Sequence, residues 1–387
     1  MATTPKILIV GAGIGGLTAA IALRQAGLGV EIFERAAALK EIGAGIGLSA
    51  NAMRVLQHLG LMQQAVDRGT VIKAAVSYTS SGHTLSRMPV HLTDVPAVCL
   101  HRAELQQTLL SALPAHCVHL GEEFVQFDTT PAGVTVHFAH GRTAVGDVLI
   151  GADGLRSRVR AQLLGDGEPV YRGYQCWRGV CDHPASELLT ETFGTGLRLG
   201  LVPIGRRGTA WWCTANEAEG AGEGPEGIQA KLLRWFGNWH PPIREVIAGT
   251  DPTAIIKSAM YDRRPVKTWS KEACTLLGDA AHPSTPNMGQ GGGMAIEDAV
   301  VLARCLSNYS DAATALRVYQ RLRYPRTAKV TRISRLYGAM GQWNAPGAVW
   351  LRNALFRLGS GKAATKGYLK FVSYDPYGII LNQRRKD

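Results

Sequence analysis

Three glycines near the N-terminus have the spacing of a phosphate-binding turn. Gly11, Gly13 and Gly16 form "GAGIGG" between the apolar run "KILIV" and the small-residue run "LTAAIAL". The first glycine permits a tight turn, the second lets the backbone approach a pyrophosphate, and the third lets a helix pack on a strand. The pyrophosphate would lie on the amide groups at the positive end of that helix. The turn therefore predicts a dinucleotide site, and a glycine-rich turn that serves packing alone is the alternative.

A carboxylate follows at the position that selects the nucleotide. Glu34 ends the next apolar run, "VEIFER". A carboxylate there accepts hydrogen bonds from both ribose hydroxyls and repels a 2′-phosphate. We therefore expect an adenosine ribose, as in FAD or NAD.

Two later clusters favour FAD over NAD. "DVLIGADGLRSRVR" carries Asp153 just after a predicted strand, and "ACTLLGDAAHPSTPNMGQGGGMAIEDAVVLA" carries Asp279 after another. A carboxylate at a strand end can bind a polyol chain, and the loop over 289–293 offers bare amides to a flat ring. Simple NAD enzymes need no such ligands so far along the chain. The alternative for both aspartates is local capping of the helix that follows.

These motifs, in this order, resemble the class A flavoprotein aromatic hydroxylases, the para-hydroxybenzoate hydroxylase-like family. The segments "YRGYQCWRGV", "ETFGTGLRLGLVPIG", "GNWHPPI" and "YQRLRYPR" are similar to the branch that contains urate hydroxylase, salicylate hydroxylase and zeaxanthin epoxidase. The resemblance covers nearly the whole chain. It implies bound FAD, with NAD(P)H as reductant and no separate nicotinamide domain.

The resemblance also implies a set of cofactor-binding residues. Arg102 suits the pyrophosphate, the backbone near Phe124 meets adenine, Asp153 also touches the nicotinamide cofactor, and Asp279 binds the ribityl chain. The full set is Gly11, Gly13, Gly16, Glu34, Arg35, Gly45, Ile46, Gly47, Arg102, Gln106, Phe124, Asp153, Asp279, Gly289, Gln290, Gly291, Gly292 and Gly293.

The catalytic residues expected on the substrate side are Arg198, Arg178 and Pro286, which lies beside the flavin ring. Arg198 is five residues before Pro203, where urate hydroxylases carry a functional arginine, but Trp211 stands where they place a catalytic tyrosine. Because tryptophan cannot accept a proton, urate is not the expected substrate. We expect either a substrate that needs no deprotonation or an arginine that lowers its pKa, with Arg198 the first candidate.

Two further patterns concern this region. The alternative for Arg178 is an ion pair across the sheet, since buried arginines are usually paired. Trp211 and Trp212 should face opposite sides of a strand, so one of them belongs to the core.

The resemblance implies a monooxygenase that uses FAD and NAD(P)H. It would insert one atom of O2 into an electron-rich aromatic or polyene (alkene) small molecule through a flavin C4a-hydroperoxide. Two alternatives use the same site. One is a flavin-dependent reductase of a prenyl or other unsaturated substrate, and the other is a non-catalytic flavin-binding regulator.

The fold expected to position these residues is α/β. A Rossmann-like FAD-binding domain would comprise residues 1–73, 99–170 and 264–330, with a first helix over roughly 17–26 and one strand through Phe124. Residues 74–98 and 171–263 would form an inserted antiparallel-sheet substrate domain. Residues 331–387 would form a C-terminal helical segment. Its amphipathic stretch "AVWLRNALFRL" is expected to pack against the FAD domain, with membrane docking the less favoured alternative.

Composition limits the remaining possibilities. The 387 residues are 46% hydrophobic and 19% charged, which is typical of a packed globular protein. No apolar run is long enough to span a bilayer, and no secretion signal is recognisable. Seven cysteines without a C-x-x-C pair predict reduced thiols, no metal site and a cytoplasmic location. The net charge of +12 either steers anionic partners or serves solubility, and its scattered basic residues do not predict nucleic-acid binding. The oligomeric state is not predicted.

Overall fold

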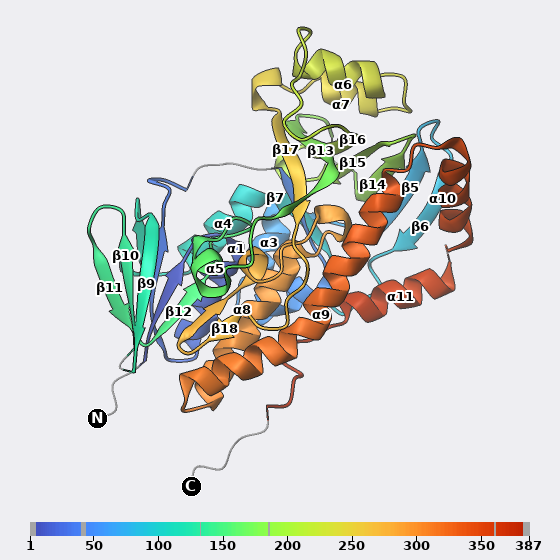
Figure 1. The fold of residues 1–387 in the computed structure, drawn as a ribbon. Helices are drawn as coiled ribbons and strands as arrows, with labels where there is room; N and C mark the ends of the chain where they lie inside the picture. Colours follow the sequence, from blue (N-terminus) through green and yellow to red (C-terminus); the bar gives the residue numbers. More distant parts are fainter. Residues whose placement is uncertain (1–4, 40–43, 132, 185, 360, 382–387) are drawn as a thin grey trace.

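A parallel sheet forms the centre of the larger part of the molecule (Figure 1). The computed structural model describes residues 5–39, 44–131, 133–184, 186–359 and 361–381, so the predicted domains include a few positions outside the described residues. The strand order is β18-β19-β12-β1-β2-β8, and all pairs are parallel except β18 with β19. The strands are β1 (Lys6–Val10), β2 (Gly29–Glu34), β8 (Val118–Leu120), β12 (Val148–Gly151), β18 (Ser270–Lys271) and β19 (Cys274–Leu276).

Helices cover this sheet, which explains why its central strands are continuous apolar runs. Helix α1 (Ile14–Gln25) packs against α8 (Gly291–Asn308), which in turn packs against α9 (Ala312–Gly341). The predicted start of the first helix was wrong by three residues, because Gly15 and Gly16 belong to the helix, where close packing outweighs their poor helix propensity. The remaining helices here are α2 (Ala50–His58), α3 (Met62–Arg68), α4 (Arg102–Ser111) and α5 (Arg158–Leu164).

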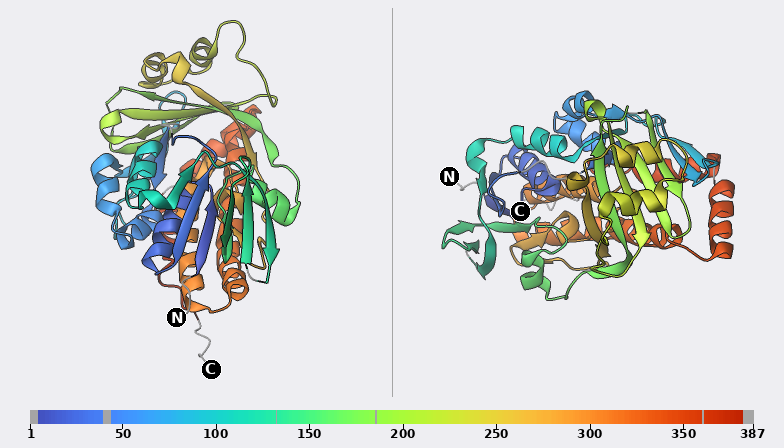
Figure 2. Two further views of the ribbon diagram at one scale, coloured as in Figure 1. Left: turned by 90° about the vertical axis from the view of Figure 1, so that its left-hand side faces the viewer. Right: turned by 90° about the horizontal axis from the view of Figure 1, so that it is seen from above.

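A seven-stranded sheet lies across the carboxyl ends of the parallel strands (Figure 2). Its order is β17-β13-β16-β15-β14-β5-β6, and it is antiparallel except for the parallel pair β14 and β5. That pair corrects the expectation of a purely antiparallel sheet: β5 and β14 come from separate segments, so no hairpin joins them. The strands are β5 (Ala74–Thr79), β6 (Thr84–Pro89), β13 (Val170–Cys181), β14 (Leu188–Phe193), β15 (Leu197–Pro203), β16 (Thr209–Asn216) and β17 (Ile256–Asp262).

The outer face of this sheet has a core of its own. Trp177 and Trp211 pack there beneath α6 (Ile228–Phe236) and α7 (Ile243–Ala248). The inner face is turned towards the parallel sheet. Residues therefore alternate between a closed core and the interface of the two sheets.

Two smaller sheets complete the fold. One contains β9 (Phe124–Thr130), β10 (Gly133–Phe138) and β11 (Thr143–Gly146), and the other contains β3 (Gly45–Leu48), β4 (Thr70–Val71) and β7 (Val98–His101). The prediction of one strand through Phe124 was wrong, because Gly121 turns the chain with φ +77° between β8 and β9.

The C-terminal helices differ from the expectation. Helix α9 runs without a break across positions 330 and 331, where a boundary was predicted. Helices α10 (Pro346–Leu358) and α11 (Lys362–Val372) both contact β6, at the edge of the seven-stranded sheet (Figure 1). The expectation that the amphipathic stretch packs on the FAD domain was therefore wrong for α10. Over the described ranges, no helix combines the length and apolarity needed to cross a bilayer.

Candidate functional site

The glycine turn joins β1 to α1 at the centre of the parallel sheet. Gly11 has φ +109°, a conformation that side-chain-bearing residues rarely adopt. A Cβ atom on Gly13 would meet no atom within 4 Å, so its backbone is open to an approaching ligand. A Cβ atom on Gly16 would lie 2.0 Å from the Gly11 carbonyl oxygen. The three glycines thus have the conformation, the open approach and the close packing that their spacing predicts.

Glu34 ends β2 beside this turn. Its Oε2 accepts a hydrogen bond from the Ala12 amide at 2.9 Å, and its Oε1 accepts one from the Ala36 amide at 3.0 Å. Gln106 donates from Nε2 to the Ala12 carbonyl oxygen at 2.9 Å. Glu34 and Gln106 therefore hold the turn from two sides.

One continuous cavity of about 1030 Å³ connects this turn to the seven-stranded sheet. It lies at the carboxyl ends of the parallel strands, where α/β folds bind their ligands. Its wall includes most of the predicted cofactor residues, namely Gly11, Gly13, Glu34, Arg35, Gly45, Ile46, Gly47, Arg102, Phe124, Asp153, Asp279, Gly289, Gln290, Gly291 and Gly292. Gly16, Gln106 and Gly293 lie behind the wall, where Gly16 and Gln106 support the turn.

Asp279 reaches the cavity from the turn after β19. Its side chain is exposed to the cavity, whose walls surround it with protein atoms. This burial raises its pKa, while His282 and Arg102 act in the opposite direction. The Arg102 side chain has no hydrogen bond or ion pair to any described residue. The cavity thus presents one carboxylate and one guanidinium that have capacity for a ligand.

Asp153 combines a place on the wall with a local structural role. Its carboxylate accepts hydrogen bonds from Ser157 Oγ at 2.5 Å and from the amides of Arg158 and Val159 at 2.8 and 3.2 Å. Burial raises its pKa, which these hydrogen bonds oppose. Asp153 therefore makes the local hydrogen bonds at the start of the next helix that the alternative interpretation described. It also lines the cavity.

The glycine loop leads into the first turn of α8. Gly291 begins this helix, and no described side chain caps it, so its first amides are open towards the cavity. A Cβ atom on Gly292 would lie 2.9 Å from the Ile46 side chain. A side chain at this position would have to displace the end of the Ile46 side chain, so glycine lets this loop approach β3 closely.

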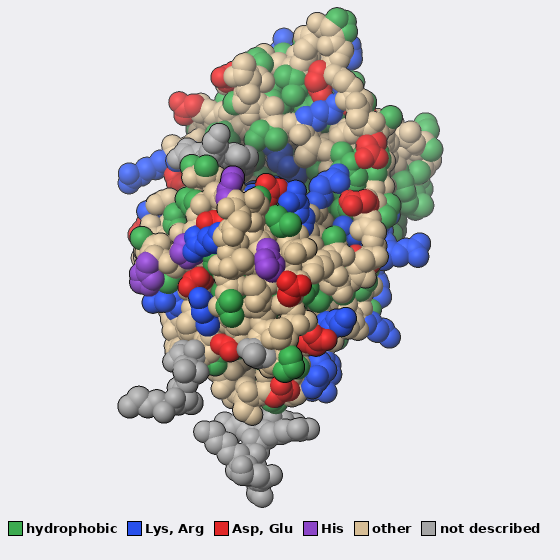
Figure 3. Space-filling view, turned by 60° about the vertical axis from the view of Figure 1, so that its left-hand side comes forward, with side chains coloured by type: hydrophobic (Ala, Val, Ile, Leu, Met, Phe, Trp, Pro, Cys, Tyr) green, Lys and Arg blue, Asp and Glu red, His purple; other side chains and the backbone are tan. Residues whose placement is uncertain are grey.

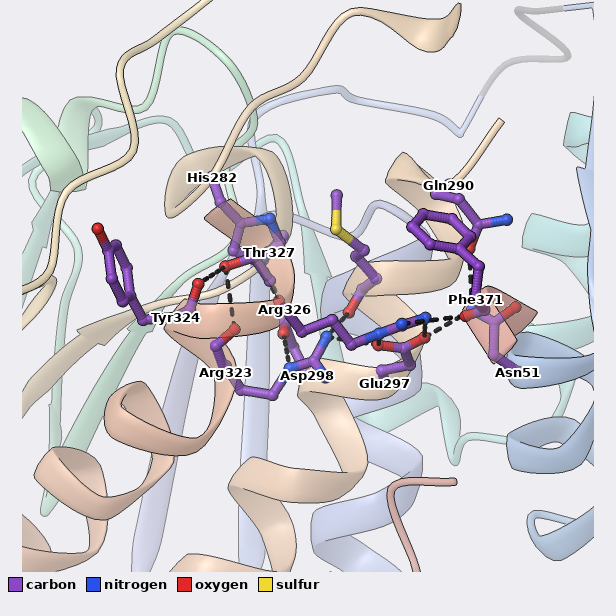
Figure 4. A network of polar contacts seen from close by, with 12 residues as sticks. Asn51, His282, Gln290, Glu297, Asp298, Arg323, Tyr324, Arg326, Thr327 and Phe371 are labelled. Atoms are coloured by element: carbon purple, nitrogen blue, oxygen red, sulfur yellow. Dashed lines mark hydrogen bonds and ion pairs between the residues drawn. The ribbon is translucent and has the colours of Figure 1, made fainter. Parts of the chain in front are cut away.

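Sequence reasoning missed a buried charge network behind the loop (Figure 4). Arg323 donates to Asp298 Oδ1 at 2.6 Å and to Glu297 Oε2 at 2.7 Å, and Arg326 donates to both Glu297 oxygens. Asn51 bridges Glu297 to the side chain of Gln290. The available signal was the acidic pair in "AIEDAV" together with the arginines of "YQRLRYPR".

These residues fit FAD. The open amides at Gly13 and Gly291, the carboxylates of Glu34 and Asp279, and the Arg102 guanidinium match the diphosphate, the two polyol groups and the ring edge of that cofactor. Bound FAD would supply the redox chemistry and the activation of O2. The protein residues bind the cofactor and shape the space beside its ring.

The inner face of the seven-stranded sheet forms the other end of the cavity. Arg178 and Trp212 are cross-strand partners on this face and both line the cavity. Trp211 lies in the outer core, where its Nε1 donates to Thr250 Oγ1 at 2.8 Å. The prediction that one of the two tryptophans is core is confirmed.

Arg198 lines the cavity but is fully buried, and each of its three side-chain nitrogens has a hydrogen-bond partner. Its Nε donates to Gln342 Oε1 at 3.0 Å, its Nη1 to Glu191 Oε1 at 3.0 Å and its Nη2 to Asn287 Oδ1 at 2.6 Å. Asn287 follows Pro286 in a short turn on the cavity wall. Arg198 therefore joins the sheet to the glycine loop and keeps little capacity for a ligand.

Arg178 differs from Arg198 in its partners. Its Nη1 donates to Ser258 Oγ at 3.1 Å. In the part of the chain that the structure describes, no carboxylate lies within ion-pair distance of it, so the alternative of a cross-sheet ion pair is not seen. Arg178 thus brings an uncompensated positive charge to the cavity wall.

Sequence reasoning also missed a carboxylate beside Arg198. Glu191 lines the cavity, and its Oε2 accepts a hydrogen bond from the Tyr337 hydroxyl at 2.9 Å. Burial raises the pKa of Glu191, although Arg198 and Tyr337 lower it. The sequence contained one signal for Glu191: its position in a strand, at a residue that faces inwards.

Known proteins resemble the chain along nearly its whole length. The FAD binding domain family model matches residues 4–334. Aurachin C monooxygenase/isomerase of Stigmatella aurantiaca is 42% identical over 96% of this chain and 100% of that protein. 3-Amino-4-hydroxybenzoate 2-monooxygenase of Streptomyces cremeus is 36% identical over 85% of this chain and 86% of its own length.

Solved structures agree with these matches. Klebsiella pneumoniae HpxO, complexed with FAD and uric acid, is 30% identical, covers 97% of this chain and 98% of its own, and has a TM-score of 0.90. A salicylate hydroxylase substrate complex shares the fold, with a TM-score of 0.81 at 21% identity over 97% of each chain. The chain therefore belongs to the FAD binding domain family, and it is an FAD-dependent monooxygenase of the class A flavoprotein group.

Proposed function

We propose that this enzyme oxygenates an electron-rich aromatic ring that carries an acidic hydroxyl or N–H group and an apolar substituent. O2 and NAD(P)H would be its co-substrates and the cytoplasm its location. We also propose that residues 1–73, 99–170 and 264–330 form the FAD-binding domain, that 74–98 and 171–263 form the substrate-binding domain, and that 331–387 form a C-terminal helical segment. The main support for this proposal is the position of Glu191, a carboxylate on the wall of a largely apolar chamber.

The chamber suits a flat, apolar molecule. Val76, Met88, Val90, Leu189 and Val202 line it beside the Trp212 ring. Burial of such a molecule removes apolar surface from water, at roughly 25 cal/mol per Å². An aromatic ring gains further by stacking or edge-to-face contact with Trp212.

Glu191 is the proposed proton acceptor. Each carboxylate oxygen already accepts one hydrogen bond and has a second lone pair for the substrate. Its raised pKa makes it a stronger base than an exposed carboxylate, while Arg198 keeps it ionised. Removal of a proton from the substrate at Glu191 makes the ring richer in electrons, and hence more reactive towards an electrophilic oxygen.

Arg178 is the proposed partner of the resulting anion. It lies on the same face as Trp212 and lacks a carboxylate partner among the described residues. A positive charge near the substrate oxygen lowers the pKa of that hydroxyl. The sequence made Arg198 the first candidate for contact with the substrate. We propose instead that Arg178 faces the substrate and that Arg198 positions Glu191.

The substitution Glu191→Gln tests the proposal. We expect kcat/KM to fall by about 10²- to 10⁴-fold, the range typical of a lost general base. FAD content should stay unchanged, because Glu191 has no hydrogen bond to any of the predicted cofactor-binding residues. The exposed Glu187→Gln variant is the control. A Glu191→Gln enzyme with undiminished kcat/KM on its best ring substrate would overturn the role of Glu191.

A further inference from the structure

Helix α10 has its apolar side facing outwards. Trp350, Leu351, Leu355 and Leu358 are exposed, with Leu358 at 83% and Trp350 at 72%, whereas Arg352 is fully buried. The four exposed side chains follow the i, i+1, i+5, i+8 spacing of one helix face. A surface helix of a soluble protein normally has the reverse arrangement.

The inward side of α10 is well bonded, so this orientation is specific. Arg352 donates to the carbonyl oxygens of Gly341 at 3.2 Å and Gly194 at 3.0 Å. Phe356 packs against Phe193 and Tyr337, with ring centroids 5.0 and 5.7 Å apart. These contacts fix the orientation of α10, so its apolar face points outwards in the folded protein. A contiguous exposed apolar face of this kind marks an interaction surface.

The charge of the C-terminal segment, in which α10 and α11 follow α9, indicates the partner. Between Asp311 and Asp375 the chain contains twelve Lys and Arg residues and no Asp or Glu, which equals the net charge of the entire protein. Some of these, such as Arg323, are buried in ion pairs, but Lys366 and Lys370 are exposed one turn apart on α11. By contrast, basic and acidic side chains are intermingled on the face shown in Figure 3.

The cavity reaches the surface beside the same helix. Leu355 and Phe356 of α10, Thr365 and Tyr368 of α11, and the exposed Gly359 between them all line the cavity. Figure 1 places α10 at the periphery of the molecule, away from α1. An apolar molecule dissolved in a bilayer would thus meet the cavity where α10 meets the lipid.

We propose that α10 and α11 dock on the surface of an anionic lipid bilayer. Trp350, Leu351, Leu355 and Leu358 enter the boundary between headgroups and acyl chains, and Lys366 and Lys370 lie against the headgroups. Exposed aromatic and aliphatic side chains beside lysines have the composition of interfacial helices. The entry of substrate from the bilayer rests on the proposed function, whereas docking does not.

Vesicle flotation of the FAD-loaded enzyme without substrate tests the proposal. Vesicles of phosphatidylglycerol should bind the protein, vesicles of phosphatidylcholine should bind it much less, and salt should weaken the binding. The variant Trp350→Gln/Leu358→Gln should lose at least roughly tenfold in affinity for each residue. Lys366→Gln/Lys370→Gln should lose about fivefold for each lysine.

The control is Val145→Gln, at a site that is 62% exposed on β11, which lies on the opposite side of the molecule from α10 in Figure 1. It should bind vesicles like the unaltered chain. None of these substituted residues lines the cavity, so activity on a water-soluble ring substrate should be unchanged, and failure of the proposed function would appear there separately. Two results would overturn docking: no binding to anionic vesicles, or a dimer in sedimentation that Trp350→Gln/Leu358→Gln converts to monomer, which would make this face a contact between two copies.

Discussion

Asp279 is the residue that we propose as the acceptor for the ribityl chain of FAD. It lies deep in the cavity with a carboxylate available to a polyol chain. Asp279→Asn should weaken FAD binding by about 1–3 kcal/mol, roughly 5- to 150-fold, because the ribityl hydroxyls lose their charged acceptor. Fluorescence titration of FAD into the apoprotein measures this effect, and the exposed Asp128→Asn variant is the control. An unchanged Kd would remove Asp279 from the site.

Arg198 is expected to act through Glu191. It lowers the pKa of that carboxyl, which burial raises. Arg198→Gln should therefore raise this pKa further. Since a carboxyl accepts a proton only when ionised, activity is present above its pKa and lost below it. The acid limb of the kcat/KM profile should move to higher pH, and Arg198→Lys should restore it in part. An acid limb at the same pH in Arg198→Gln and the unaltered enzyme would contradict the positioning role.

At the scale of elements, the charge network fixes α9 against α8 and the glycine loop. Burial would raise the pKa of Asp298, but the attraction of His282 and Arg323 outweighs it and lowers this pKa to about 2. The network therefore stabilises the fold above the ordinary pKa of 3.8, and that contribution is lost as the pH falls towards about 2.

Arg323→Met should cost about 3–5 kcal/mol of unfolding free energy, because it leaves buried carboxylates without their partner. Thermal and urea unfolding at neutral pH measure this loss. Arg321→Met, at an exposed position of the same helix, should change stability by less than about 0.5 kcal/mol. Equal losses of unfolding free energy in the two variants would show that the buried ion pairs of Arg323 do not stabilise the fold.

Local features of this fold could be predicted from the sequence, whereas features that depend on distant residues could not. The turn of Gly11, Gly13 and Gly16 was predictable because its geometry depends on residues within six positions. The partners of Arg198 were not: Gln342 is 144 residues away, and Glu191 reaches it only through strand pairing. Likewise, an amphipathic pattern shows that α10 has two faces, but it does not tell which face is turned outwards.

At the scale of the whole molecule, one cavity connects the parallel sheet, the seven-stranded sheet and the C-terminal helices. The parallel sheet carries the glycine turn at one end of this cavity, the seven-stranded sheet forms the other end, where we propose that the substrate binds, and residues of α10 and α11 line it too. The order of motifs predicted the first of these closely. The substrate end depends on which side chains of each strand face inwards, and that is settled only by the register of β13, β15 and β16.

The most direct test of the account uses isotopically labelled dioxygen. The FAD-loaded enzyme is incubated with NAD(P)H, labelled O2 and a panel of hydroxylated aromatic rings with apolar substituents, and the products are weighed by mass spectrometry. We predict a product that gains one labelled oxygen atom, with NAD(P)H oxidised in step, and less of this product from the Asp279→Asn enzyme at limiting FAD. A product that gains two hydrogens and no label would contradict it.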